Sequence, residues 1–216
     1  ALGPGAQPEL CGIGAAVVAD WQPLAVDARS GRSLSDLGAE LSDRIAALGI
    51  DVRPGFDAAN LPRRVDRVVV GNLAGKDNPE LVAALARGLP VASMPETLRT
   101  EFLAGRHPVV VAGTHGKTTT TALTAWLLAA AGEAPGYLVG GEPSPSAIGA
   151  GPAFVLEGDE YSTSWEDKGP KFLHYAPETF VLTSVEFDHA DLYADLDAVK
   201  AAFRAGVALV PPSGRI

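Results

Sequence analysis

Residues 109–119 read Val-Val-Val-Ala-Gly-Thr-His-Gly-Lys-Thr-Thr. An apolar run suited to a buried strand enters a glycine-containing turn, and a stretch rich in Thr and Ala with helical character begins at Lys117. This order is the layout of a phosphate-binding loop, because the free amides at a helix N-terminus attract phosphate. The stretch departs from the general motif GxxxxGK[ST], since Val111 stands at the first glycine position.

The loop supplies the candidate residues for binding ATP. Lys117 is expected to reach the β- and γ-phosphates, and the Thr118 hydroxyl is expected to ligate Mg²⁺. The alternative is an ordinary strand-to-helix turn with a solvated lysine, but the order of strand, loop, Lys-Thr pair and helix favours the phosphate site. The full candidate set is Gly113, Thr114, His115, Gly116, Lys117, Thr118 and Thr119.

Acidic residues follow two further apolar runs. The run 154–157 ends at Glu157 and continues into Gly158-Asp159-Glu160, whereas the run 180–183 is followed by an acidic segment that contains His189. Ligands of open parallel sheets lie outside the carboxyl ends of the strands, so both segments should face the phosphate loop. Glu157 suits Mg²⁺, and a neutral His189 imidazole suits a second divalent ion. A solvated carboxylate and a hydrogen-bonded structural histidine are the open alternatives.

The rest of the chain repeats an alternation of short apolar runs and helical stretches, which predicts an α/β fold around a mainly parallel sheet. A polar link at 105–108 predicts a boundary between domains 1–106 and 107–216, and 140–152 is expected to form a long loop. Asn78 is expected to cap one helix and Gly132 to end another. The expected strands are 24–26, 67–70, 90–92, 109–112, 137–139, 154–157 and 180–183, and the expected helices are 34–48, 79–87, 95–103, 117–131 and 196–209.

Composition and charge exclude several classes of partner. The 216 residues carry 17 Lys and Arg against 26 Asp and Glu, and the net charge of −9 opposes binding to nucleic acid or to anionic membranes. The longest apolar run, 122–131, is about half of the ~20 residues that a membrane span needs. The single cysteine, Cys11, favours a reducing compartment. We therefore expect a cytoplasmic protein without nucleic-acid or membrane partners, and the sequence leaves its oligomeric state open.

Three motifs together resemble the Mur ligases, which join amino acids or peptides to UDP-N-acetylmuramic acid with ATP. They are residues 113–119, 157–160 and 188–191. Four short segments are more similar to the members that attach the peptide L-Ala-γ-D-Glu-meso-diaminopimelate in peptidoglycan recycling than to those that add L-alanine. They are residues 159–161, 167–168, 171–175 and 186–191. The resemblance implies a Rossmann-like N-terminal domain for the UDP-sugar, followed by part of a central P-loop ATPase-type domain.

The resemblance also implies site residues and cofactors. ATP and Mg²⁺ are the expected cofactors, UDP-N-acetylmuramic acid and a muropeptide are the expected partners, and Lys117, Glu157 and His189 are the expected catalytic residues. Contacts to the UDP-sugar are expected at Gly3, Gly5, Asp27 and Asn72. A plain N-terminal stub is the alternative for the first of these segments.

Some positions depart from the family pattern. Ser184 stands where Asn is usual, Lys76-Asp77 replace Arg-Gly, and Arg204 stands where some members carbamylate a lysine. Two other functions stay open, an L-alanine-adding ligase and a non-catalytic UDP-sugar-binding module. Because Mur ligases also carry a C-terminal third domain, we expect this chain to be an incomplete ligase that does not form the amide by itself.

Overall fold

The computed structural model describes residues 43, 46–47, 49–53, 55–140, 146–188 and 190–216. The chain divides into two compact units, residues 1–92 and 93–216, and each is described by itself. The expected boundary at 106/107 therefore lies too far along the chain. Residues 93–106 group with the second unit because Leu98, Phe102 and Leu103 pack into its hydrophobic core.

The described part of the first unit includes two short paired strands with a helix between them in the chain. Strand β1 (Val68–Val70) neighbours β2 (Val91–Ser93), and between them lies helix α2 (Pro79–Ala86). The Asn78 side chain accepts hydrogen bonds from the amides of Glu80 and Leu81, which confirms the expected cap. A short 3-10 helix, η1 (Ala58–Asn60), precedes β1. The strand expected at 24–26 and most of the helix expected at 34–48 lie outside the described residues.

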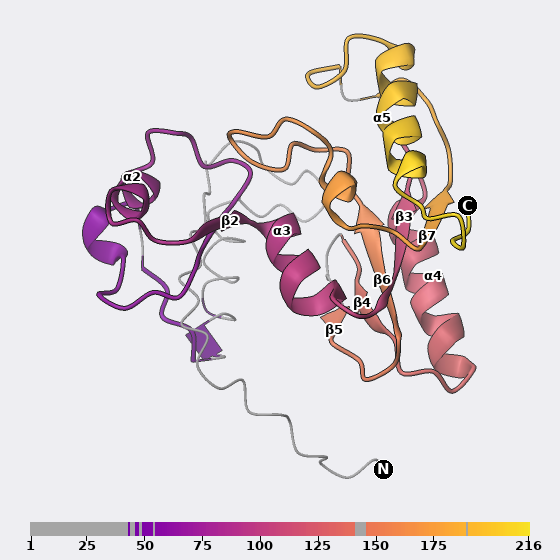
Figure 1. Cartoon of the computed structure of the whole chain (residues 1–216), viewed down its shortest axis with the longest axis horizontal. Helices are drawn as coiled ribbons and strands as arrows, with labels where there is room; N and C mark the ends of the chain where they lie inside the picture. Colours follow the sequence, from indigo (N-terminus) through magenta and orange to yellow (C-terminus); the bar gives the residue numbers. More distant parts are fainter. Residues whose placement is uncertain (1–42, 44–45, 48, 54, 141–145, 189) are drawn as a thin grey trace, which may run out of the picture. The chain divides into compact units, whose positions relative to one another are not determined.

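The second unit is built on a five-stranded sheet with the order β5-β4-β6-β3-β7 (Figure 1). Strand β3 runs parallel to β6 and β7, β4 runs parallel to β6, and β5 alone in this sheet is antiparallel. This mainly parallel sheet confirms the predicted α/β class. Strand β5 lies within the segment expected to be a loop. The strands are β3 (His107–Ala112), β4 (Gly136–Leu138), β5 (Ser146–Ala147), β6 (Ala153–Gly158) and β7 (Thr179–Leu182).

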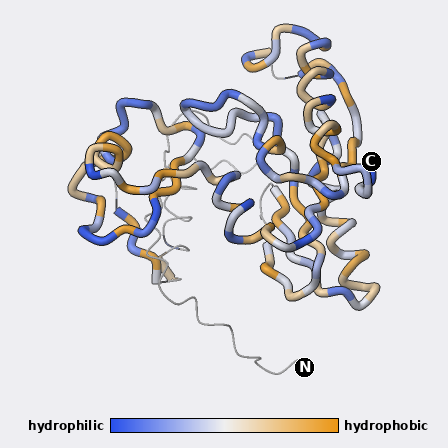
Figure 2. Tube along the Cα trace, in the orientation of Figure 1, coloured by the Kyte–Doolittle hydropathy of each residue, from blue (hydrophilic) through white to orange (hydrophobic). Residues whose placement is uncertain are grey.

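Alternate residues of β3 face opposite sides of the sheet, and both sides are covered. Val109 and Val111 pack with Ala125 of helix α4 (Lys117–Ala130), whereas Val110 packs on the side of helix α5 (Leu196–Ala208). Burial on both faces explains why the strand is a continuous apolar run rather than an alternating one (Figure 2). On the α5 side, the aromatic rings of Phe172, Phe180 and Phe203 form the centre of the core.

Three shorter helical segments complete the second unit. The helix expected at 95–103 is helix α3 (Met94–Leu98) followed by a π-helical segment, η2 (Arg99–Leu103), and the 3-10 helix η3 (Lys171–His174) lies before β7. Gly132 takes a left-handed φ of +88° just after α4, as expected for the residue that ends a helix.

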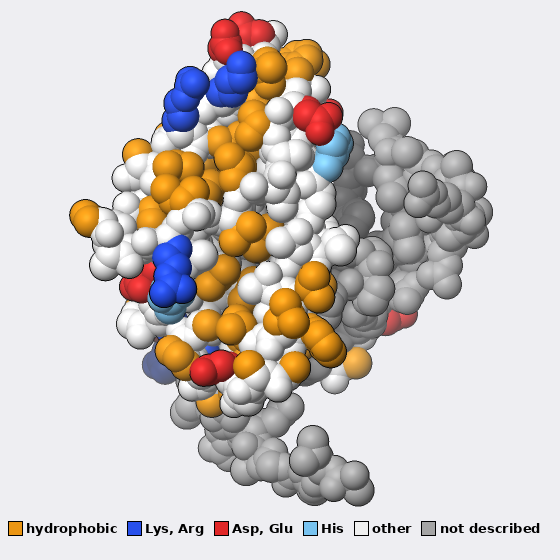
Figure 3. Space-filling view, turned by 90° about the vertical axis from the view of Figure 1, so that its right-hand side faces the viewer, with side chains coloured by type: hydrophobic (Ala, Val, Ile, Leu, Met, Phe, Trp, Pro, Cys, Tyr) orange, Lys and Arg blue, Asp and Glu red, His pale blue; other side chains and the backbone are white. Residues whose placement is uncertain are grey.

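One face of the second unit is rich in exposed hydrophobic side chains (Figure 3). Helix α4 contributes Leu123, Trp126 and Leu127, each at least half exposed. None of the described helices is both long and apolar enough to cross a lipid bilayer.

Candidate functional site

The loop between β3 and α4 depends on two glycines. Gly116 has φ +83° and precedes the first residue of α4, and Gly113 has φ +131°. A Cβ on Gly113 would overlap the Thr183 hydroxyl and would lie 2.9 Å from the Ser184 amide nitrogen. Both φ values disfavour residues with a side chain, and the crowding at Gly113 excludes one. The loop is therefore shaped by its own backbone and by the segment that follows β7.

That segment, residues 183–186, holds the loop by hydrogen bonds. The Thr183 hydroxyl donates to the His115 carbonyl at 2.6 Å, and the Thr114 amide donates to the Ser184 carbonyl at 2.9 Å. The His115 amide donates to the Ser184 hydroxyl at 3.0 Å, so Ser184 makes a polar contact to the loop. The Glu186 amide donates to the Thr114 hydroxyl at 2.9 Å.

These bonds limit which amides of the loop could face a phosphate, a group expected from the sequence at the helix N-terminus. The amides of Thr114 and His115 already have acceptors on the segment after β7. Amides of this loop that could serve an anion are therefore to be sought nearer to the start of α4. Thr118 and Thr119 lie in the exposed first turn of that helix.

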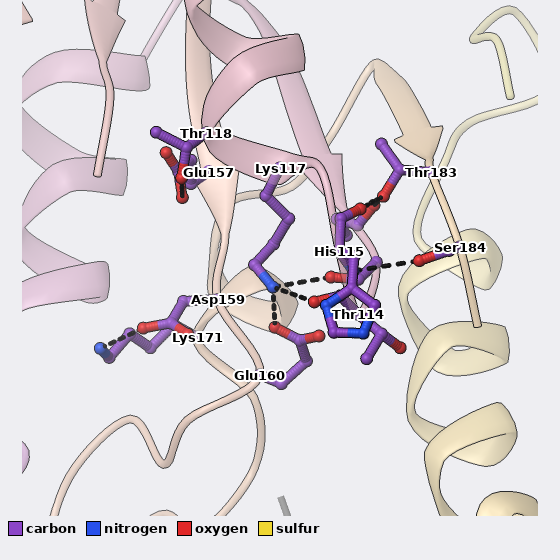
Figure 4. A network of polar contacts seen from close by, with 12 residues as sticks. Thr114, His115, Lys117, Thr118, Glu157, Asp159, Glu160, Lys171, Thr183 and Ser184 are labelled. Atoms are coloured by element: carbon purple, nitrogen blue, oxygen red, sulfur yellow. Dashed lines mark hydrogen bonds and ion pairs between the residues drawn. The ribbon is translucent and has the colours of Figure 1, made fainter. Parts of the chain in front are cut away.

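Lys117 lies over this loop with its ammonium group held at three points (Figure 4). Its Nζ donates to the Gly113 carbonyl at 2.7 Å and to the Thr114 carbonyl at 3.3 Å, and it forms an ion pair with Glu160 Oε2 at 2.8 Å. The side chains of Lys117 and Glu160 are only 15% and 3% exposed. The ion pair is therefore largely shielded from water. Because of this shielding, the attraction between the two charges is stronger than it would be at an exposed surface.

Burial is the main influence on Glu160. Loss of hydration raises the pKa of its carboxyl above the ordinary 4.5, and the hydrogen bond and charge of Lys117 oppose that rise. The backbone carbonyl of Glu160 also accepts a hydrogen bond from the Tyr193 hydroxyl at 3.1 Å. Burial, followed by the negative charges of Glu160 and Asp159, raises the pKa of Tyr193 to about 12, so this hydroxyl stays a donor at neutral pH.

The structure brings Thr118 and Glu157 together beside the loop. The Thr118 hydroxyl donates to Glu157 Oε2 at 3.3 Å, and the Gly140 amide donates to Glu157 Oε1 at 2.6 Å. Glu157 is next to the end of β6 and pairs in register with Val111 of β3, which explains how the two motifs meet at one edge of the sheet.

The donor set fits a hard divalent cation such as Mg²⁺, since it offers one hydroxyl and one carboxylate. Within the part of the chain that is described, no three His, Cys, Asp or Glu side chains gather into a metal cluster. Most ligands of a Mg²⁺ ion here would therefore be phosphate oxygens and water, as is usual for this ion.

The other expected site residues divide into two groups. Asn72 lies in the turn that follows β1 in the first unit. Gly3, Gly5, Asp27 and His189 lie outside the described residues, so the proximity expected between Glu157 and His189 stays a prediction.

Sequence reasoning gave no role to Glu160 or to Thr183. Glu160 was grouped with its acidic neighbours, although its position just beyond the end of β6 was a signal that it reaches the loop lysine. A neighbouring pair has the same form, because Asp159 Oδ2 lies 2.8 Å from Lys171 Nζ. Glu160 differs in that it pairs with the loop itself.

Comparison with known proteins relates this chain to a family. Residues 35–105 match the Mur ligase family, catalytic domain. A UDP-N-acetylmuramate–L-alanyl-gamma-D-glutamyl-meso-2,6-diaminoheptandioate ligase of Escherichia coli (strain K12) is 39% identical over 180 residues, which are 82% of this chain and 39% of that protein. This chain carries a Mur ligase family domain. The family match ends before the loop between β3 and α4, whereas the alignment with the relative covers most of the chain.

Further relatives of the Mur ligase domain fall into two groups. A UDP-N-acetylmuramate–L-alanine ligase of Kineococcus radiotolerans is 42% identical over 179 residues, 80% of this chain and 36% of that protein. A solved UDP-N-acetylmuramate:L-alanyl-gamma-D-glutamyl-meso-diaminopimelate ligase from Neisseria meningitides is 43% identical, with a TM-score of 0.72 over 81% of this chain and 58% of that one. The chain thus spans less than half the length of these curated relatives.

Proposed function

We propose that this chain is the nucleotide-binding part of an ATP-dependent ligase that joins the peptide L-Ala-γ-D-Glu-meso-diaminopimelate to UDP-N-acetylmuramic acid in peptidoglycan recycling. The observation that carries the proposal is the position of Lys117 over a glycine loop, beside the Thr118–Glu157 pair at the carboxyl ends of β3 and β6. Ligands of open parallel sheets bind at this edge. A cytoplasmic location belongs to the proposal because the reaction consumes ATP.

The loop binds the phosphates of ATP. Lys117 places a positive charge at the β- and γ-phosphates, and the helix N-terminus of α4 supplies amides to the same groups. The residues proposed for this task are Gly113, Thr114, His115, Gly116, Lys117, Thr118 and Thr119. Thr114 and His115 contribute by fixing the conformation of the loop backbone, because their amides are already hydrogen-bonded within the protein.

Thr118 and Glu157 are proposed to hold Mg²⁺, with His189 as a ligand of a second divalent ion. When bound, Mg²⁺ neutralises charge on the phosphate oxygens. The chain's own contribution is geometric: the Gly140 amide orients the Glu157 carboxylate toward Thr118. Unaltered Mg²⁺ dependence of ATP turnover after Glu157→Ala and His189→Ala would reject this assignment.

The proposed reaction needs alignment more than covalent participation of the protein. The carboxylate of UDP-N-acetylmuramic acid attacks the γ-phosphorus, ADP leaves, and the peptide amine then displaces phosphate from the acyl phosphate to form the amide. Lys117 stabilises negative charge that develops on the transferred oxygens. The proposed contacts to the UDP-sugar are Gly3, Gly5, Asp27 and Asn72 of the first unit.

The identity of the acceptor is supported by the pattern of similarity. The Neisseria structure, a peptide-adding ligase, is 43% identical with a TM-score of 0.72, whereas a solved UDP-N-acetylmuramate-alanine ligase from Thermotoga maritima is 25% identical with a TM-score of 0.65. L-Alanine-adding relatives nevertheless reach 42% identity, so the alanine ligase is the second candidate.

An ATP-dependent ligation assay with the full gene product tests the proposal. The enzyme is incubated with UDP-N-acetylmuramic acid, ATP, Mg²⁺ and either L-alanine or the tripeptide, and products are identified by mass. We expect the tripeptide product together with stoichiometric ADP, and neither from Lys117→Ala. Acceptance of L-alanine with refusal of the tripeptide would favour the second candidate, and ATP binding without ADP release would indicate a non-catalytic binding module.

A further inference from the structure

The ammonium nitrogen of Lys117 lies within 3.3 Å of three protein oxygens, two as hydrogen-bond acceptors and one in an ion pair. Two of these oxygens are carbonyls of the same loop: that of Gly113, four residues earlier, at 2.7 Å, and that of Thr114, three residues earlier, at 3.3 Å. The third is Glu160 Oε2, which belongs to the segment after β6. An ammonium group has only three protons to donate, so a phosphate oxygen has to take or share one of these positions.

Glu160 is the partner that a phosphate would displace. The two carbonyls shape the loop itself, and they stay beside Lys117 whenever the loop keeps its conformation. The Glu160 carboxylate is the only anion among the three partners, so it resembles a phosphate oxygen in charge and in its distance from Nζ. Because its side chain is 3% exposed, water does little to weaken its attraction for Lys117.

We propose that Glu160 is a positioning residue that holds Lys117 over the loop and competes with the nucleotide phosphate for its ammonium group. The inference rests on the proposed function, because it takes the loop to be the phosphate site. Two anions that share one ammonium group in a poorly hydrated site repel each other. The ion pair therefore has two effects. It holds the Lys117 side chain over the loop before phosphate binds, and it has to be weakened or broken when phosphate binds.

The neighbouring Asp159–Lys171 pair provides a matched control. It has the same 2.8 Å contact distance, comes from the adjacent residue, and leaves Lys117 untouched. Asp159→Asn and Glu160→Gln each remove one negative charge from this segment. Only Glu160→Gln removes the ion pair of Lys117. Glu160→Gln keeps the shape of the side chain and a neutral acceptor for the lysine.

The test is isothermal titration calorimetry of the 216-residue chain with Mg-ATP, inorganic tripolyphosphate and adenosine. We expect Glu160→Gln to bind Mg-ATP and tripolyphosphate about tenfold more tightly than the wild type, the size expected from one charge-assisted hydrogen bond. Adenosine binding should not change, and Asp159→Asn should stay within about twofold of the wild type because its charge is screened and unpaired with Lys117. Glu160→Asp, which retains the charge, should restore an affinity near that of the wild type.

Each outcome decides the question. Equal or weaker phosphate binding by Glu160→Gln, with a wild-type circular dichroism spectrum, would overturn the competition while the phosphate site stands. An equal gain in Asp159→Asn would also overturn it, since the effect would then come from net charge. Failure of both the wild type and Glu160→Gln to bind either phosphate ligand would reject the proposed function and this inference together.

Discussion

Replacing Lys117 by methionine should destabilise the second unit through Glu160. Met fills a similar volume but cannot pair with the carboxylate, so Glu160, 3% exposed, is left as a buried charge without its cation. Removing one partner of a buried pair is more damaging than exchanging both, because the remaining group keeps its full desolvation penalty.

The expected loss can be bounded. A carboxyl with an ordinary pKa of 4.5 can escape by taking up a proton, which at pH 7 requires about 3.4 kcal/mol at about 1.36 kcal/mol for each pH unit. We therefore expect Lys117→Met to lower the free energy of unfolding by about 2–3 kcal/mol at pH 7. At pH 5 the free energy needed to protonate this carboxyl is below about 1 kcal/mol, so the expected loss of stability is correspondingly smaller.

The sign of this pH dependence follows from the direction of the pKa shift. Because the pKa of Glu160 is raised in the folded state, the folded protein binds this proton more tightly than the unfolded chain does. Stability linked to Glu160 is therefore full below pH 4.5 and is lost as the pH rises through the folded-state pKa. In Lys117→Met that pKa rises further, so the loss relative to the wild type should grow from pH 5 to pH 7.

Urea unfolding followed by circular dichroism at both pH values measures the effect, and Lys117→Met/Glu160→Gln is the matched double variant. The double variant should recover most of the stability lost at pH 7, because it buries no unpaired charge. A loss below about 0.5 kcal/mol at pH 7, or an equal loss at both pH values, would refute the reasoning, since such a small effect is typical of an exposed pair.

Three other changes test separate parts of the structure. Gly113→Ala should lower the free energy of unfolding in urea by more than about 3 kcal/mol. The control is Gly105→Ala, because Gly105 has a φ of +73° but no neighbour within 4 Å, and it should lower that free energy by only about 1 kcal/mol. Equal losses would show that crowding against Thr183 is unimportant. Glu157→Gln should weaken Mg-ATP binding about tenfold and leave Mg²⁺-free ATP binding unchanged in calorimetry, and an equal loss in both would remove Glu157 from the metal site. Asn78→Ala should lower the stability of the first unit by about 1 kcal/mol through loss of two capping bonds, and no change in its hydrogen-exchange protection would contradict that role.

Most of the second unit was predictable from local patterns. The continuous apolar run of β3 indicated a strand covered on both faces, and Gly132 marked the end of α4. In the first unit, Asn78 marked the start of α2 in the same way. The domain boundary was not predictable in this way, because Gly105 and Pro108 suggest a link although α3 and η2 pack into the following unit. Which unit a short helix joins depends on long-range packing of residues such as Phe102.

The candidate site was predictable in its residues more than in its contacts. The placement of Thr118 beside Glu157 follows from the rule that parallel strands present their carboxyl ends at one edge. The pairing of Lys117 with Glu160, and the capture of the Thr114 and His115 amides by residues 183–186, are set by the distance between separate loops. No spacing along the chain encodes that distance.

Nuclear magnetic resonance of the ¹⁵N-labelled chain titrated with Mg-ATP tests the central claim that the loop after β3 binds nucleotide phosphate. The account predicts that the largest amide shifts occur in the loop and first helical turn, residues 113–119, and that they disappear in Lys117→Ala while the remaining spectrum is preserved. Shifts centred on another part of the chain, or shifts at 113–119 that are unchanged in Lys117→Ala, would contradict it.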